Sequence, residues 1–502
     1  MISPIRSVAG PMPLCPPKRS IDPSARSSGQ SIAFLERANG EAVDPSVRSS
    51  GQSITFLERA NGEAVDNPRF PLHHKDMKNP MPNILLFLAA AIALLSSAPG
   101  YALPNGQVPP QTAEAFIDRG VALGQLGEHE AAILYFSEAI RLDPTLAIAF
   151  TWRGIMHEEM GNFDQAIADY TEAIRLDPNF STAFNNRGFV HSHMGNHALA
   201  IADFNQAILI DPNYAIAFNN RGFVHGNIGN NDLAIADFNQ AILIDPNLAI
   251  AFFNRGSVHS NMGNYAFAIA DFDQAILISP NFARAFNNRG SAHSNMGNYA
   301  LAIADFDQAI LIYPNYATAF NNRGLVHSMM ENFALAIADF DQTILIYPNY
   351  AIAFFNRGRV HAAMGNDVLA IADFDQTILI DPNHARAFIS RGGTHITMGN
   401  HALAIADFDQ AILIDPNNAT AFTNRGIGHL FMGNLDLAIA DLNQAIFIDP
   451  NYARAFNSRG GAHTMMENYA LAIADFEAAL LIEPNHTGAQ HNFDLARQLL
   501  GY

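Results

Sequence analysis

The chain has 502 residues, of which 49% are hydrophobic and 15% charged, and its formal net charge is −19. From residue 79 onward there is no lysine, and 18 arginines stand against 39 acidic residues. Nucleic-acid binding depends on cations that neutralise phosphates, so this balance argues against nucleic acid and against anionic membranes as partners. The only cysteine is Cys15, which excludes a metal or redox site built from cysteines.

Residues 1–76 have the composition of a disordered segment. Asp22–Val43 recurs almost unchanged as Asp44–Val65, and both copies are rich in Ser, Gly and Arg without sustained periodicity. A second start codon position lies at Met77. We therefore expect residues 1–76 to be disordered or untranslated.

Residues 77–102 have the layout of a secretory signal peptide. Lys78 supplies a positive charge, Ile84–Leu95 is an apolar run of 12 residues, and Gly100-Tyr101-Ala102 fits a cleavage site. The pattern predicts an exported protein, periplasmic or secreted, with residues 103–112 as a linker. The alternative is an uncleaved membrane anchor over residues 84–103, if translation begins at Met1.

A strict repeat of 34 residues follows. Taking Ala113 as the first place of the first copy, eleven copies cover residues 113–486 without an insertion, and each has proline at its thirty-second place. A period of this size indicates one supersecondary unit stacked along a line, because each copy is too small to bury its apolar face alone. The prolines are Pro144, Pro178, Pro212, Pro246, Pro280, Pro314, Pro348, Pro382, Pro416, Pro450 and Pro484.

The third copy, residues 181–214, illustrates the unit. Both halves place apolar or small residues at intervals of three and four, which is typical of helices. Gly195 can close the first helix in a left-handed conformation, and Asn196 can cap the second through its side chain. Pro212 ends the second helix, so the unit is a helix–turn–helix with no strand signal.

Residue size predicts the contacts between the helices. The eighth place is always glycine, the twentieth always alanine, and the twenty-seventh alanine except at Thr343 and Thr377. The fourth place is always phenylalanine, and the twenty-fourth is aromatic except at Leu442. Small side chains let two helices approach closely, and a buried ring contributes roughly 1.5–3 kcal/mol.

This arrangement, exemplified by Gly188, Ala200, Ala207 and Pro212, resembles the tetratricopeptide repeat. The resemblance implies an all-α fold, a right-handed α-solenoid superhelix in which the first helices line a concave groove that holds a peptide or protein. Residues 487–502 are expected to form a closing helix, with Phe493, Ala496 and Leu500 on one face. The family commonly has leucine at the seventh place and tyrosine at the eleventh. Here the seventh is always arginine and the eleventh is histidine in ten copies.

Arginine at the seventh place predicts an ion pair with aspartate at the twenty-third, within a copy or between neighbours, because an unpaired buried charge is costly. A row of anion-binding arginines is the alternative. The first copy is the exception, since it keeps Arg119 but has Tyr135 in place of the acid. The histidines, one in each of ten copies, are too far apart for a metal site, and we expect each to donate a hydrogen bond to the same aspartate.

Asparagines at the sixth place are the candidate peptide-binding residues. They resemble the asparagine ladder in the repeat region of O-linked N-acetylglucosamine transferase, and the resemblance implies that their amides hold a peptide backbone. An amide offers one donor group and one acceptor, which suits a peptide unit. The residues are Asn186, Asn220, Asn254, Asn288, Asn322, Asn356 and Asn424.

These patterns predict a non-enzymatic scaffold without cofactor that binds extended segments of a partner protein. A transferase is disfavoured because only 16 residues follow the repeats, the sequence offers no nucleophile–base constellation, and the acids recur as structural copies. The alternatives are a substrate-recruiting module of a glycosyltransferase-type system and a self-associating structural array. Arg284, Arg386 and Arg454 make the later copies more basic on the groove side.

Overall fold

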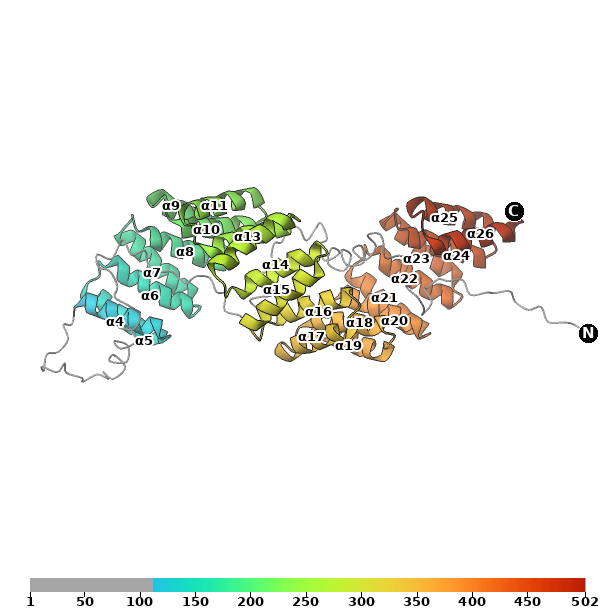
Figure 1. Cartoon of the computed structure of the whole chain (residues 1–502), viewed down its shortest axis with the longest axis horizontal. Coiled ribbons are helices and arrows are strands. Elements are labelled where there is room, and N and C mark those ends of the chain that lie inside the picture. The colour runs from blue at the N-terminus through green and yellow to red at the C-terminus, as the bar shows by residue number, and fades with distance from the viewer. Residues whose placement is uncertain (1–111, 502) are drawn as a thin grey trace, which may run out of the picture. The chain divides into compact units, whose positions relative to one another are not determined.

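The computed structural model describes residues 112–501, and these are α-helical without any strand. Twenty-three helices, α4 to α26, alternate with short turns (Figure 1). The prediction of an all-α solenoid of helix–turn–helix repeats is confirmed. The helices belong to two compact units, residues 112–296 and residues 297–501, and the boundary falls in the turn of the sixth repeat.

The even-numbered helices α4 to α24 are the first helices of the eleven repeats. They are α4 (Ala113–Gln125), α6 (Ala147–Glu159), α8 (Ser181–His193), α10 (Ala215–Asn227), α12 (Ala249–Asn261), α14 (Ala283–Asn295), α16 (Ala317–Met329), α18 (Ala351–Ala363), α20 (Ala385–Thr397), α22 (Ala419–Phe431) and α24 (Ala453–Met465).

The odd-numbered helices are the second helices of the same repeats, and α26 follows them. They are α5 (His129–Leu142), α7 (Phe163–Leu176), α9 (His197–Ile210), α11 (Asn231–Ile244), α13 (Tyr265–Ile278), α15 (Tyr299–Ile312), α17 (Phe333–Ile346), α19 (Asp367–Ile380), α21 (His401–Ile414), α23 (Leu435–Ile448), α25 (Tyr469–Ile482) and α26 (Thr487–Leu500).

The turn inside each repeat depends on one residue in the left-handed conformation. Gly195 has φ +78°, as predicted, and Glu331 and Glu467 adopt φ 59° and 63° where the other repeats have glycine. The predicted side-chain cap is wrong, however: Asn196 makes no side-chain hydrogen bond to the next helix, and its backbone carbonyl accepts from Ala200 instead. At the other end, Asp211 accepts from the backbone N–H of Asn213 and so holds the Asp-Pro turn.

Close packing of glycine against an aromatic ring joins the two helices of a repeat. In ten repeats a Cβ added to the glycine of the eighth place would lie within 3.0 Å of the side chain at the twenty-fourth. Gly324 and Phe340 are an example, with 2.9 Å to the ring atom Cε1. Phe340 is fully buried beside Ala336. The predicted pairing of small and large residues is therefore confirmed.

Within each unit the first helices form one layer and the second helices another. Where both helices belong to one unit, first helices of neighbouring repeats contact each other directly, and each second helix packs on the first helix of its own repeat and on the next one. The closing helix α26 packs on α25 and α24, as predicted, with Ala496 buried. Leu500 departs from the prediction because it is exposed.

The remaining predictions about the N-terminal part concern residues outside the described range. These are the disordered or untranslated segment 1–76, the signal peptide 77–102, the alternative anchor 84–103 and all but the last residue of the linker 103–112. Among the described helices, none combines the length and the apolar character that a membrane crossing requires.

Candidate functional site

The face of the first helices that points away from the second helices is the candidate binding face; we call it the first-helix face. Places 2, 5, 6, 9 and 13 of a repeat share this side, since at about 100° per residue they lie roughly 60–160° around the helix, in one direction, from the glycine at place 8. Place 7 lies between the two layers. The sequence-predicted arginines, histidines and asparagines therefore have different surroundings.

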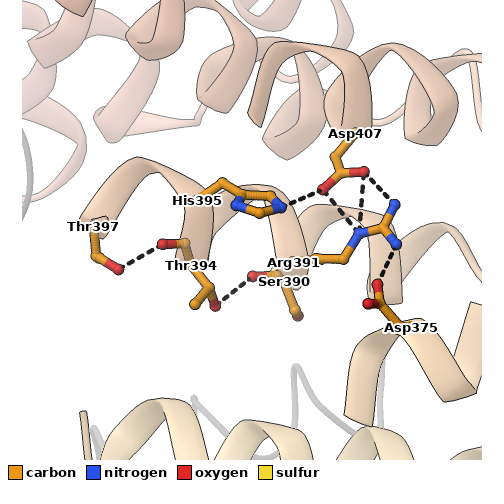
Figure 2. A network of polar contacts seen from close by, with 7 residues as sticks. All are labelled: Asp375, Ser390, Arg391, Thr394, His395, Thr397 and Asp407. Atoms are coloured by element: carbon orange, nitrogen blue, oxygen red, sulfur yellow. Dashed lines mark hydrogen bonds and ion pairs between the residues drawn. The ribbon is translucent and has the colours of Figure 1, made fainter. Parts of the chain in front are cut away.

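The arginine at the seventh place is a clamp between two repeats. In nine repeats its Nε and one terminal nitrogen donate to the aspartate at the twenty-third place of the same repeat. Its other terminal nitrogen donates to the side chain at the twenty-fifth place of the preceding repeat. Figure 2 shows Arg391 donating to both Asp407 and Asp375, with terminal N–O distances of 2.5 Å.

Burial explains why the pair is needed. The arginine side chains are about one-fifth exposed and the aspartates of the twenty-third place are buried. The hydrogen bond to Asp407 is the main cause that raises the pKa of Arg391 above its usual value. The predicted Arg–Asp pair is confirmed, and these arginines are structural: their donors bond the protein's own acceptors.

The first repeat replaces the carboxylate by a ring. Arg119 lies with its guanidinium carbon 5.7 Å from the centre of the Tyr135 ring, which occupies the place of the aspartate. An aromatic face attracts a guanidinium, although more weakly than a carboxylate does. Arg119 is the exception noted in the sequence analysis, and in the structure the Tyr135 ring lies beside its guanidinium where the other repeats have the aspartate.

The histidine at the eleventh place does not make the predicted hydrogen bond. In six repeats its Nε2 lies 3.9–4.0 Å from the aspartate, beyond hydrogen-bond distance. Its Nδ1 is buried without a hydrogen-bond partner among the described residues, as at His395. Burial is the main cause that lowers the pKa of His157, His191 and His225, while the nearby aspartate opposes this shift. The histidine of the eleventh place is therefore a packing residue, and at His157, His191 and His225 burial favours the neutral form.

Asparagines of the sixth place bond to asparagines of the fifth where the same or the preceding repeat has one. Across α8, α10 and α12 they form one chain: Asn254 donates to Asn219 at 3.0 Å and Asn219 to Asn220 at 3.2 Å. Asn220 in turn donates to Asn185 at 3.1 Å, and Asn185 to Asn186 at 3.2 Å. These amides join neighbouring first helices to each other.

The seven predicted peptide-binding residues fall into two groups. Asn186, Asn220 and Asn356 are buried, with 1–7% of their surface exposed. Asn356 donates to Asn321 at 3.1 Å, and the same contact recurs between Asn492 and Asn457. The half-exposed group consists of Asn254, Asn288, Asn322 and Asn424.

The sequence analysis missed the partner of the ladder, although a signal was present. An asparagine at place 5 is followed 35 residues later by asparagine at place 6, as in Asn185 and Asn220. Where place 5 is phenylalanine, at Phe253 and Phe355, the amide chain stops. Both rings are buried in the first-helix layer.

A cationic cluster surrounds the second of these rings. The guanidinium carbons of Arg386 and Arg359 lie 5.5 Å and 5.8 Å from the centre of Phe355, and the His384 ring lies 4.8 Å from it. All four residues come from α18 and the start of α20. Burial, and then the charge of Arg386, lower the pKa of Arg359. We call these four residues the Phe355 cluster.

The ring of the fifth repeat has a similar but smaller environment. Arg284 lies 5.0 Å from the centre of Phe253, from the same place 2 of the following repeat that Arg386 occupies. Arg359 has no counterpart there, because Ser257 stands at its place. The Phe355 cluster is therefore the denser concentration of positive charge.

Models of the tetratricopeptide repeat match residues 113–316, 322–418 and 423–499. The chain belongs to the tetratricopeptide repeat family. Repeats of this family generally form non-enzymatic scaffolds for protein or peptide partners. A comparison with curated proteins finds no match.

Several solved structures of tetratricopeptide repeat proteins are similar to the chain. Cut9–Hcn1 from the APC/C hetero-tetramer is 12% identical, with a TM-score of 0.43 over 82% of this chain and 99% of that one. Yeast Tom70 is 14% identical, with a TM-score of 0.40 over 77% and 95%. YrrB is 22% identical, with a TM-score of 0.32 over 37% and 96%.

Proposed function

We propose that the chain is a non-enzymatic scaffold that holds an extended, acidic segment of a partner protein on its first-helix face, with the Phe355 cluster as the main contact. Membership of the tetratricopeptide repeat family supports the role of a scaffold. The observation that carries the acidic preference is the pair of arginines on one buried ring, in a chain that is otherwise strongly acidic.

The chemistry of the cluster suits a carboxylate. Guanidinium groups present several N–H donors in one plane and bind carboxylates through two hydrogen bonds. Burial, and then the charge of Arg386, lower the pKa of Arg359, and a carboxylate bound at the cluster favours the charged form of both arginines. His384 accepts from the backbone of Ala387 through Nδ1 at 3.1 Å, so its remaining nitrogen can donate.

Each unit has half-exposed asparagines of the sixth place on its own first-helix face. Asn254 and Asn288 belong to residues 112–296, and Asn322 and Asn424 to residues 297–501. In this proposal Asn322 and Asn424, which belong to the same unit as the Phe355 cluster, offer amides to the backbone of the bound segment, at a net of roughly 0.5–1.5 kcal/mol per hydrogen bond. The buried members Asn186, Asn220 and Asn356 hold the repeats together and do not contact the segment.

Fluorescence anisotropy with a labelled peptide tests the proposal. The probe is Gly-Gly-Glu-Glu-Gly-Gly, and the matched neutral peptide has Gln in place of Glu. The wild-type chain should prefer the acidic peptide, and the double variant Arg359→Gln with Arg386→Gln should lose affinity roughly tenfold or more, because hydrogen bonds to charged groups contribute about 1.5–3 kcal/mol.

Arg497→Gln is the control, since Arg497 also lies over a phenylalanine ring, Phe493, but on the closing helix. It should leave the affinity unchanged. Equal binding of both peptides by the wild-type chain, or an equal loss in the control, would contradict the acidic preference.

A further inference from the structure

A second surface, on the opposite side of the repeats, carries exposed hydrophobic residues at a fixed spacing. In residues 297–501 the nineteenth place of each repeat is leucine with 52–55% of its surface exposed, and the twenty-ninth is leucine or phenylalanine with 71–85% exposed. We call these residues the outer strip: Leu301, Leu311, Leu335, Leu345, Leu369, Leu379, Leu403, Leu413, Leu437, Phe447, Leu471 and Leu481.

The outer strip plays no part in the core. On α17 the buried side chains are those of Ala336, Asp339, Phe340 and Thr343, which face the first helices. Leu345 lies on the other side of that helix, and Leu335 lies at its flank with 54% of its surface exposed. Places 19, 22, 26 and 29 lie within about a quarter turn of one another, and places 22 and 26 are uncharged alanine and glutamine in these repeats up to α23.

The first two repeats show that the fold does not require an apolar residue at place 29. Arg141 occupies it in α5 and bonds to Glu138 at 2.6 Å, and Arg175 in α7 bonds to Glu172 at 2.6 Å. From the third repeat onward this ion pair is absent. Place 29 is a large hydrophobic residue, and place 26 is glutamine, or alanine in the last repeat. In the other unit, the helices α9, α11 and α13 also expose large hydrophobic residues at places 19 and 29.

The charges beside the outer strip are largely neutralised. Asp307, Asp341, Asp375 and Asp409 stand at place 25, half-exposed, and each accepts from the arginine clamp of the next repeat. A second acidic chain can therefore approach this surface with less repulsion than the net charge of −19 suggests.

The size of the outer strip suits an interface between two copies. Complete burial of a large hydrophobic side chain contributes about 1.5–3 kcal/mol at about 25 cal/mol per Å², which corresponds to roughly 60–120 Å² of apolar surface. With 52–85% of their surface exposed, the twelve side chains together present roughly 500–900 Å² on one copy. Two facing copies would bury about 1,000–1,800 Å², close to the 1,200–2,000 Å² of a stable protein interface. Isolated monomers rarely expose a patch this large.

The spacing of the outer strip points to the occupant. Its leucines recur once per repeat at both places, so a partner that covers all of them must present apolar residues at the same interval. Another copy of this chain does so by construction, and two identical strips meet in a closed twofold contact.

We propose that the chain forms a homodimer through its outer strip. The contact lies on the second helices, so both first-helix faces stay accessible to a partner. This inference is independent of the acidic preference proposed above.

Sedimentation velocity of the full chain over a concentration series tests the dimer. The wild-type chain should pass from monomer to dimer. The triple variant Leu345→Gln, Leu379→Gln and Leu413→Gln should raise the dissociation constant at least about tenfold, because six exposed leucines leave the interface. A second variant, Gln444→Glu with Phe447→Arg, copies the ion pair of the first two repeats into α23 and should weaken the dimer in the same direction.

Leu126→Gln with Phe223→Gln is the control, because both side chains are exposed but lie outside the outer strip. It should dimerise like the wild type, and all variants should keep the wild-type helical circular dichroism. A wild-type chain that stays monomeric, a dimer that both strip variants leave unchanged, or flotation of a monomer with phosphatidylcholine vesicles would overturn the proposal.

Discussion

The first repeat and the later repeats solve the same packing problem with different chemistry. In the first repeat Arg119 lies on the Tyr135 ring, whereas in the second Arg153 forms a bidentate pair with Asp169. Both repeats nevertheless place a fully buried ring against the glycine of the eighth place. The fold therefore depends on the contact between glycine and ring, and the partner of the arginine is open to replacement.

The outer surface shows the same freedom. Arg175 in the second repeat and Leu209 in the third both stand at the twenty-ninth place of their repeats. Because either residue is accepted there, that place is available for an interaction with another molecule. The difference between the early and later repeats separates what the fold requires from what it permits.

The largest expected effect is at the shared contact. Gly154→Val and Gly324→Val should each destabilise their repeat by about 2–3 kcal/mol, because the new side chain would lie within 3.0 Å of Tyr170 or Phe340. Hydrogen exchange of the amides in α6–α7 and α16–α17 measures the local free energy of opening. Similar losses in the early and the later repeat are expected, and a loss in only one would break the comparison.

A smaller effect is expected at the arginine clamp, and there the two kinds of repeat should differ. Asp237→Ala removes the bidentate partner of Arg221 and should cost about 2 kcal/mol, reduced by the partial exposure of the arginine. Tyr135→Phe keeps the ring under Arg119 and should cost less than 0.5 kcal/mol. Hydrogen exchange in α10–α11 and α4–α5 measures both, and equal costs would contradict the distinction.

The smallest effect concerns pH and the histidines of the later repeats. Burial lowers the pKa of His191 and His225 in the folded chain, so the unfolded chain binds more protons near pH 6. The stability that these neutral histidines provide is complete above the unfolded pKa of about 6.5 and falls as the pH drops through the folded pKa.

The melting temperature should therefore decrease between pH 7.5 and pH 5.5. His191→Leu with His225→Leu should reduce this decrease, since Leu123 already occupies the eleventh place in the first repeat. A melting temperature that rises over this interval would contradict the direction of the shift.

Much of the fold follows from the sequence because the decisive contacts lie inside one repeat. The spacing of 16 residues between Gly188 and Phe204, or between Arg187 and Asp203, is fixed by one helical hairpin. The ends of the helices follow from glycine and proline for the same reason. Such contacts recur with every copy and can be read from one of them.

Contacts between repeats were harder to predict. The bond from Asn220 to Asn185 depends on how far neighbouring first helices are shifted along each other, which the hydropathy pattern does not specify. The prediction for the histidine failed for a related reason. His191 is near enough to Asp203 for that charge to act on its pKa, but the guanidinium of Arg187 already bonds both carboxylate oxygens. The Phe355 cluster combines side chains of two repeats and was visible in the sequence only as a bias toward arginine.

Hydrogen–deuterium exchange of the full chain with and without the Gly-Gly-Glu-Glu-Gly-Gly peptide tests the central claim most directly. The account predicts new protection in the first helices α18 and α20, around the Phe355 cluster, and none in the second helices α19 and α21. Protection confined to the second helices, or the same protection with the neutral glutamine peptide, would contradict it.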